Sequence, residues 1–516
     1  MSYFHHKERQ ASIVAGNTLF IDGGDVTTWD RTGNGFSNGS TLTKANDTRT
    51  YSIDLTSSWS TSDVTITPIE KTTSLSFSSG TLWLNASGDS FYQFDGGVSL
   101  TQGPYNVAPP SQLWSYALNS QSSRWTNATT PDVVKLKRIQ SGTYASGGGL
   151  GFALGGWQSY DTDQSVGLGD HYVGGMVVFN STSQTFTNVS SFGDYTYSSS
   201  GAGHFVSSYG PAGIFMPFGG ASMTGSVLPL DYITMYEPTT QTWKRQRTTG
   251  DIPAPVQNAC VAGASGDNGT YEIFLFGGLQ EAKDGWRQVD SSMYILSLPL
   301  FRWFRVSTTA VGRHRHTCSL AGHSQMVSVG GMVGTIKDSS VGSEDLGAPD
   351  PWQQQGLGIF DMNALKWSTQ YTSSAATYTS PSTIKSYIAA SGPTPTSFDD
   401  DAIKSWFATK NTVSSSPTAS TASTTTSGRS VGAIVAAVVI PVVVLLALGG
   451  LAFWLLRRRR SKRSTYHYSR TSYEEPMYAK TAYQGGSPLE LHGASRIEEA
   501  GGAQIYELSH EQHVLK

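Results

Sequence analysis

Short hydrophobic runs recur six times along the first 370 residues, and each run ends at two consecutive glycines. The runs have the length of β-strands, and the segments between them are rich in residues that favour turns. The pattern predicts buried strands that end where the backbone needs a positive φ or a close approach to a neighbouring chain segment. The glycine pairs are Gly23 and Gly24, Gly96 and Gly97, Gly155 and Gly156, Gly219 and Gly220, Gly277 and Gly278, and Gly330 and Gly331.

A large aromatic residue follows each glycine pair after a variable polar segment. We interpret each unit as a four-stranded antiparallel sheet whose aromatic side chain packs between adjacent sheets, because one sheet cannot bury it alone. The starts of the first and last units also match, since Arg9 and Arg315 lie 14 and 15 residues before their glycine pairs. The aromatic residues are Trp59, Trp125, Phe186, Trp243, Trp303 and Trp367.

This repeating pattern resembles the kelch repeat, and the resemblance covers about residues 9–370. Kelch repeats build β-propellers, so the resemblance implies an all-β fold, a kelch-type β-propeller of six blades with a seventh, degenerate blade left open. The glycine pairs are spaced by 53 to 73 residues, whereas a kelch unit has about 50. We therefore expect the surplus residues in loops between the strands.

One uncharged hydrophobic stretch, 431–456, is long enough to cross a bilayer as a single transmembrane α-helix. Basic residues follow it directly, whereas only Arg429 lies close before it. The positive-inside bias therefore predicts a cytosolic C-terminus and an N-terminal part outside, at the cell surface or in the secretory pathway. The basic cluster comprises Arg457, Arg458, Arg459, Arg460, Lys462 and Arg463.

The segments outside the repeats differ in composition. Residues 411–430 are rich in Ser and Thr and indicate an O-glycosylated stalk or a flexible linker, and 457–516 indicate a disordered cytosolic tail whose tyrosines suit adaptor docking. Residues 371–410 are interpreted as a C-terminal extension of the ectodomain, with a short helix expected to begin at 399–401. Residues 1–8 are interpreted as an N-terminal remnant with a signal peptide missing upstream, because they lack an apolar core segment.

Charge and glycosylation motifs narrow the class of protein further. The net charge is −3 and charged residues make up 14% of the chain, which gives no electrostatic basis for binding nucleic acid. Seven N-glycosylation motifs precede the hydrophobic stretch, in agreement with an extracytoplasmic glycoprotein. Their asparagines are Asn38, Asn46, Asn85, Asn127, Asn180, Asn188 and Asn268.

The sequence contains no catalytic motif that we can assign, so no catalytic, cofactor-binding or metal-ligating residue is predicted. The kelch resemblance brings in galactose oxidase, whose copper needs two His and two Tyr with a Cys cross-linked to one Tyr, and no such set can be identified. His204 and His316 are expected to have packed, structural roles, and His314 is expected in a solvated loop. Cys260 and Cys318 are expected to be buried free thiols rather than a disulfide, because equivalent strands of adjacent blades usually lie too far apart.

The whole layout resembles the kelch-repeat membrane proteins of filamentous fungi. A propeller face presents loops from every blade around one axis, which favours binding of a protein or a cell-surface glycan. Two alternatives stay open: a galactose-oxidase-like copper radical oxidase acting on carbohydrates or alcohols, and a kelch scaffold in cell-surface organisation or signalling through the tail. We expect no cofactor and no nucleic-acid partner.

Overall fold

The structure is a computed structural model that describes residues 2–30, 41–71, 77–98, 108–118, 125–167, 169–282, 286–334, 336–337, 350, 352 and 356–408. The chain divides into two units, Met1–Ala419 and Ser420–Lys516. The expected stalk at 411–430, the hydrophobic stretch at 431–456 with its basic cluster, and the tail at 457–516 all lie outside the described residues. Among the helices that are described, none has both the length and the apolar character needed to cross a bilayer.

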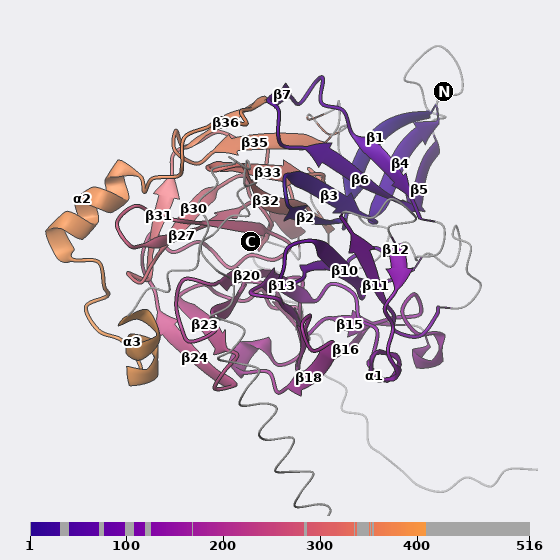
Figure 1. Ribbon diagram of the computed structural model, residues 1–516, viewed down its shortest axis with the longest axis horizontal. Helices are drawn as coiled ribbons and strands as arrows, with labels where there is room; N and C mark the ends of the chain where they lie inside the picture. The colour runs from indigo at the N-terminus through magenta and orange to yellow at the C-terminus, as the bar shows by residue number, and fades with distance from the viewer. Residues whose placement is uncertain are drawn as a thin grey trace, which may run out of the picture. The chain divides into compact units, whose positions relative to one another are not determined.

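The described part of the chain up to residue 371 forms a six-bladed β-propeller, seen along its axis in Figure 1. Each blade is a sheet of four antiparallel strands in the order A, B, C, D from the axis outward. Blades 1 to 3 comprise β2 (Ala11–Ala15), β3 (Thr18–Asp22), β6 (Arg49–Asp54) and β8 (Thr67–Glu70); β9 (Thr81–Leu84), β10 (Ser90–Phe94), β11 (Leu113–Ala117) and β12 (Trp125–Asn127); and β13 (Thr143–Gly147), β14 (Leu150–Leu154), β17 (Met176–Asn180) and β18 (Thr185–Val189). Blades 4 to 6 comprise β20 (Ala202–Val206), β21 (Ile214–Phe218), β23 (Tyr232–Glu237) and β24 (Thr242–Arg247); β26 (Cys260–Ser265), β27 (Tyr271–Phe276), β30 (Met293–Leu298) and β31 (Arg302–Val306); and β32 (Thr317–Ala321), β33 (Gln325–Val329), β35 (Leu357–Asp361) and β36 (Lys366–Ser368).

The hydrophobic runs of the sequence are the B strands. Every residue of β21, β27 and β33 is buried, because a B strand has sheet neighbours on both sides and another blade against each face. Phe152 of blade 3 and Phe215 of blade 4 stack with 4.9 Å between ring centroids and 8° between planes. Burial of such aromatic surface between blades stabilises each sheet only in the presence of its neighbours.

The ring closes between blade 6 and blade 1, where β32 lies beside β2. A short strand, β7 (Trp59–Ser60), pairs with β37 (Gln370–Tyr371) directly after blade 6, and Trp59 stacks on Tyr371 with centroids 4.9 Å apart. Six blades therefore complete the circle, and the described ranges contain no seventh four-stranded sheet. The D strand of blade 1 is β8, which begins eight residues after Trp59. Trp59 therefore lies outside the four-stranded sheet of blade 1.

The surplus length of the repeats forms additional strands at one edge of the blades. They are β1 (Ser2–Glu8) with β4 (Asp25–Asp30) and β5 (Thr41–Asn46), β15 (Trp157–Gln158) with β16 (His171–Tyr172), β19 (Ser198–Ser199) with β22 (Ala221–Ser222), β28 (Leu279–Glu281) with β29 (Trp286–Val289) and β34 (Ile336–Lys337), and β25 (Thr249–Gly250) beside β31. The connections between B and C strands and those between blades all lie at the edge where the B strands end. We call this side of the propeller the mouth face. Residues 1–8, interpreted as a remnant, contain β1, which pairs with β4 on this face.

Helices are short and few in the described residues: α1 (Pro131–Val134), α2 (Ser382–Ser391), α3 (Asp401–Ala408), and the 3₁₀ turns η1 (Gln164–Val166) and η2 (Gly193–Tyr195). The helix expected near 399–401 is α3, whose first turn is capped by Asp400 accepting a hydrogen bond from the Ala402 amide at 2.8 Å. Its buried face contains Ile403, Trp406 and Phe407.

The C-terminal extension packs beside blades 4 and 5 (Figure 1). The amide of Gly210, in the turn between β20 and β21, donates to the Trp406 carbonyl at 2.9 Å. Lys385 of α2 pairs with Asp267, in the turn between β26 and β27, at 2.7 Å. Both turns join A to B strands, so they lie at the edge opposite the glycine pairs. The described chain therefore ends on the face opposite the mouth face.

Candidate functional site

Six residues with left-handed backbone surround the propeller axis on the mouth face, each just before an A strand. Their φ values lie between 54° and 59°. The amide of each donates to the carbonyl of the equivalent residue in the preceding blade, at 2.7 to 3.0 Å, and the six bonds close into a circle. In blade order the residues of this mouth ring are Arg9, Ser79, Ser141, Ser200, Asn258 and Arg315. All six are partly exposed, so the ring presents side chains at the axis.

A second circle of backbone hydrogen bonds joins each B strand to the next blade. The second residue of the turn that ends the B strand donates to the carbonyl two positions before the next mouth-ring residue, at 2.6 to 2.9 Å. The donors and acceptors are Gly24 to Phe77, Gly96 to Ile139, Gly156 to Ser198, Gly220 to Val256, Gly278 to Arg313 and Gly331 to Lys7. The glycine pairs of the sequence therefore lie at every seam between blades, where they carry one of the two bonds.

Glycine is needed at these turns because the next blade comes too close for a side chain. A Cβ on Gly219 would lie 2.0 Å from the Val256 carbonyl oxygen, and Gly219 also has a φ of +58°. In blade 2 the turn differs from the sequence-based assignment: Asp95 and Gly96 have positive φ, and Gly97 does not. Asp tolerates the left-handed region better than most residues, and the Asp95 carboxylate here accepts a hydrogen bond from the Ile139 amide at 3.3 Å. Burial raises the pKa of Asp95 well above its ordinary value.

The charged residues of the mouth face gather around the two arginines of the mouth ring. Arg315 donates to the Glu8 carboxylate at 3.0 Å, and Arg9 to Asp25 at 3.4 Å. Glu8 is fully buried, whereas the side chains of Arg9 and Arg315 keep 30% and 15% of their exposure. The seam between blades 6 and 1 thus has two guanidinium groups that are held in place at one end and reach solvent at the other.

Two aspartates outside the mouth ring belong to the same electrostatic neighbourhood. Burial raises the pKa of Asp161, with Asp25 adding to the rise and Arg9 opposing it. Burial also raises the pKa of Asp170, opposed by His171 and Arg9. The mouth face therefore combines fixed positive charge at the axis with carboxylates around it, an arrangement that suits a polar, charged ligand surface.

Arg313, His314 and His316 are buried, which corrects the expectation of a solvated loop around His314. Arg313 is fully buried and pairs with Asp350 at 3.1 Å, donates to the Gly330 carbonyl at 2.6 Å and lies over the Trp352 ring at 3.2 Å. Burial and the nearby Arg315 lower the pKa of His314 to about 3, so its ring is neutral. The carboxylate of Asp350 neutralises Arg313 in the interior, which the sequence around residue 314 does not reveal.

Cys260 and Cys318 form a disulfide, which corrects the expectation of free thiols. Their Cα atoms are 5.4 Å apart, within the range that a disulfide spans. Both lie on A strands, β26 and β32. Blades diverge from the axis outward, so A strands of neighbouring blades are close together although the outer strands are not. The expectation of free thiols was wrong because A strands lie closer together than the average spacing between blades.

The two histidines expected to be packed are buried or partly buried. The Nε2 atom of His204 lies 2.9 Å from the Tyr271 hydroxyl, and burial lowers the pKa of His204 to about 4. His316 is 5% exposed and lies edge-on to Phe276 with centroids 5.3 Å apart. Within the described residues, one group of His, Cys and acidic side chains is compact enough to share a metal ion: Cys260, His316 and Cys318.

The predicted aromatic residues contact the preceding blade at several seams. Phe186 lies 5.6 Å from Phe94, Trp303 lies 6.3 Å from Phe218 and Trp367 lies 4.6 Å from Phe276, all between ring centroids. Trp243 reaches the same kind of seam by donating its indole N–H to the Ser190 carbonyl at 2.8 Å. Trp125 is buried in a cluster that includes Phe20 of blade 1.

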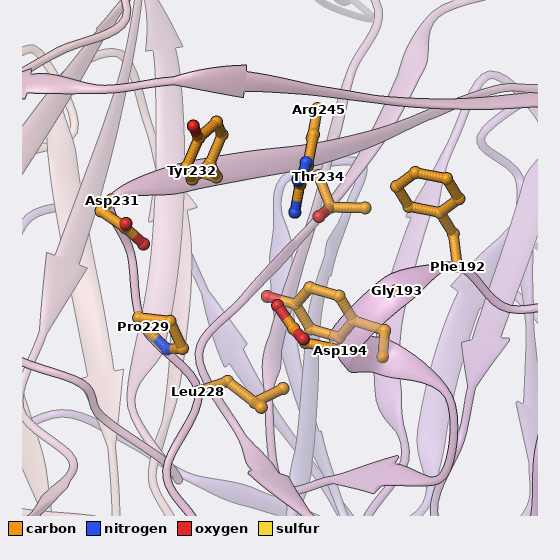
Figure 2. A pocket seen from close by; sticks show the side chains of 10 residues that line it. Phe192, Gly193, Asp194, Leu228, Pro229, Asp231, Tyr232, Thr234 and Arg245 are labelled. Carbon is orange, nitrogen blue, oxygen red and sulfur yellow. The ribbon is translucent and has the colours of Figure 1, made fainter.

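A shallow pocket lies at the rim of the mouth face between blades 3 and 4 (Figure 2). Its empty volume is about 390 Å³, part of it open to solvent. Arg245 lies 4.8 Å from the centre of the Tyr232 ring, and Asp194 and Asp231 are exposed beside them. Figure 2 shows these side chains on opposite walls of the hollow. Little of this space is wide enough for even a water-sized molecule, so the pocket does not suit a small-molecule ligand and we regard it as part of the outer contact surface.

The glycosylation motifs lie in turns and on exposed strands wherever their side chains are described. Asn127, Asn188 and Asn268 are exposed, whereas Asn85 and Asn180 are partly buried and accept backbone hydrogen bonds within their own turns. Asn38 lies outside the described residues, as does the side chain of Asn46. Glycosylation at all seven stays a prediction.

Sequence reasoning missed the mouth ring, apart from aligning Arg9 with Arg315. Ser79, Ser141, Ser200 and Asn258 share no residue type that distinguishes them from loop residues. Their common features are backbone conformation and position, which become visible once the blades are in place. A polar residue about 14 to 19 positions before each turn at the end of a B strand is the sole signal in the sequence, and it is weak.

The comparisons with known proteins support the kelch interpretation in part. The chain has a homologue described as "Kelch repeat-containing protein" from Arthroderma benhamiae, 29% identical over 173 residues. This match covers 33% of the chain and 24% of the relative, so the chain spans about a quarter of the relative's length. No family model matches the sequence. A solved structure titled "Structure of YjhT" aligns with a TM-score of 0.47 and 11% identity, covering 70% of this chain and 97% of that one.

Proposed function

We propose that the protein is an interaction module that binds a protein partner on the mouth face of the propeller. The observation that supports this most strongly is that most of the long insertions lie on that face, around a mouth ring whose two arginines are fixed yet partly exposed. Charged side chains that are already held in place lose little conformational entropy when a partner binds. They also favour a partner of complementary charge. A kelch-type propeller fits protein binding in general, and a cell-surface glycan is the alternative ligand for the same face.

Attachment to a membrane through 431–456 is part of this proposal. The described chain ends with α3 on the face opposite the mouth face. Expression of the full chain followed by endoglycosidase digestion tests the orientation. We expect a mobility shift from N-glycans on Asn127, Asn188 or Asn268. An unshifted, unglycosylated chain would place the propeller on the cytosolic side.

Site-specific photo-crosslinking on intact cells tests the binding face. A photoreactive amino acid replaces Asp161 on the mouth face in one variant and Asp63, exposed in the connection between β6 and β8 on the opposite face, in another. We expect a discrete adduct from position 161 and none from position 63. Peptides in that adduct support a protein partner, whereas hexose without foreign peptide supports a glycan. An adduct from position 63 alone, or from neither position, contradicts the proposal.

A further inference from the structure

The seam between blades 5 and 6 brings two sulfur atoms and an imidazole together near the axis. The Sγ atoms of Cys260 and Cys318 and a ring nitrogen of His316 all lie within 4.8 Å of one another. Cys260 and His316 are 4% and 5% exposed, and Cys318 is partly exposed. Thiolate sulfur and imidazole nitrogen are the donors that zinc and other thiophilic cations prefer.

His316 carries an independent sign of an unmet interaction. Neither of its ring nitrogens makes a hydrogen bond of acceptable geometry, although the side chain is buried. A buried polar atom without a hydrogen-bond partner is destabilising, and hydrogen bonding does not explain the orientation of this ring. A neutral imidazole has a lone pair available to a metal ion.

We propose that reduction of the disulfide converts this seam into a metal site, in which Cys260, Cys318 and His316 bind a thiophilic divalent cation such as Zn²⁺. In the reduction, a dithiol supplies two electrons and two protons, the S–S bond breaks, two thiols form and the dithiol becomes a disulfide. In the binding step, the two thiols release two protons and their sulfurs form bonds to the cation. The net charge of the two thiolates balances that of the ion.

The backbone keeps the three ligands together after the S–S bond is broken. The Gly278 amide donates to the Arg313 carbonyl at 2.8 Å, and the Arg315 amide donates to the Asn258 carbonyl at 3.0 Å. These bonds cross the same seam within a few residues of Cys260 and His316. Two thiolates at about 2.3 Å from a tetrahedral ion are separated by about 3.8 Å. The two sulfurs therefore move apart from their bonded distance after reduction, on Cα atoms that are 5.4 Å apart.

Cobalt substitution on the full chain tests the site. The protein is reduced with a phosphine, transferred to metal-free, oxygen-free buffer and titrated with Co²⁺, whose thiolate complexes absorb by charge transfer. We expect one Co²⁺ per reduced chain, displaced by Zn²⁺, and no such absorption from the oxidised protein. Cys260→Ser should abolish the signal. His316→Gln should weaken Co²⁺ binding at least tenfold, and His204→Gln, at a partly buried histidine of another seam, should leave it unchanged.

Several outcomes decide against the site. A reduced chain that keeps its native circular dichroism but gives no charge-transfer absorption overturns it, as does binding that is equally strong in the His316→Gln variant. Should the reduced chain lose its fold, recovery of the native spectrum on adding Zn²⁺ supports the site, and failure to recover overturns it.

Discussion

The seam between blades 6 and 1 and the seam between blades 5 and 6 have the same backbone hydrogen bonds but different reinforcement. At each, a mouth-ring amide and a glycine amide donate across the seam. The first seam, where distant parts of the chain meet, adds the Arg315–Glu8 ion pair and the stacked rings of Trp59 and Tyr371. The second adds the Cys260–Cys318 disulfide. One seam should therefore respond to acid and to loss of aromatic packing, and the other to reductant.

Removal of the disulfide should have the largest effect on stability. The cysteines are separated by 58 residues. Opening a closed loop of that size raises the conformational entropy of the unfolded chain and lowers the free energy of unfolding by about 4 kcal/mol. Chemical denaturation of the Cys260→Ala, Cys318→Ala double variant, followed by tryptophan fluorescence with a chelator present, should show this loss. Reduced wild-type protein should match the variant, and the variant itself should not respond to reductant. An unchanged midpoint in reduced wild-type protein would contradict the covalent role of this seam.

Truncation of Tyr371 should weaken the closing seam by about 3 kcal/mol. The ring is 1% exposed and stacked on Trp59, and its hydroxyl donates to the Leu55 carbonyl at 3.1 Å. Tyr371→Phe removes only the hydrogen bond and should cost about 1 kcal/mol. Tyr160, which is 44% exposed, supplies the control, since Tyr160→Ala should leave the denaturation midpoint in place. Equal losses from Tyr371→Ala and Tyr371→Phe would show that ring packing does not hold the seam.

A methyl group at a seam glycine should cost about 2 kcal/mol or more through strain and close approach. In Gly330→Ala the new Cβ would lie 2.4 Å from the Lys7 carbonyl oxygen, with φ at +60°. Gly269→Ala is the matched control, because Gly269 has a φ of +73° but no atom within 4 Å of a Cβ. It should therefore cost about 1 kcal/mol from backbone strain alone. Similar unfolding free energies for the two variants would mean that the neighbouring blade moves away from the new methyl group without loss of stability.

The contacts at these seams also differ in how far they can be predicted from the sequence. A hydrophobic run ending in glycines has a local cause, because a buried strand and a crowded turn each restrict the residues that fit. Gly330 and Gly331 were identifiable for that reason. The disulfide and the Arg313–Asp350 pair join residues from separate turns or blades, and no local pattern reports how near the axis two strands lie. The mouth ring is harder still, since its conformation is imposed on serine and asparagine by the neighbouring blade.

Acid should weaken the attachment of β1 to the insertion of blade 1, beside the closing seam, with the smallest effect of the four. Burial works against ionisation of Asp47, yet the pair with Lys7 at 2.7 Å and the hydrogen bond from Tyr51 at 2.8 Å outweigh it and lower the pKa of Asp47. Because this pKa is lower in the folded chain than in the unfolded one, the stabilisation is present above about pH 4 and disappears as the pH falls through the folded value.

Replacing the pair by Lys7→Met with Asp47→Leu should change the free energy of unfolding at neutral pH by only about 1 kcal/mol and should make the loss of stability below pH 4 shallower. The exposed pair of Lys135 and Asp132 is the control, because the same replacement there should leave the acid profile unchanged. If both double variants follow the wild-type profile of unfolding free energy against pH, the Lys7–Asp47 pair contributes nothing to holding β1 on blade 1, and the backbone hydrogen bonds between β1 and β4 hold it instead.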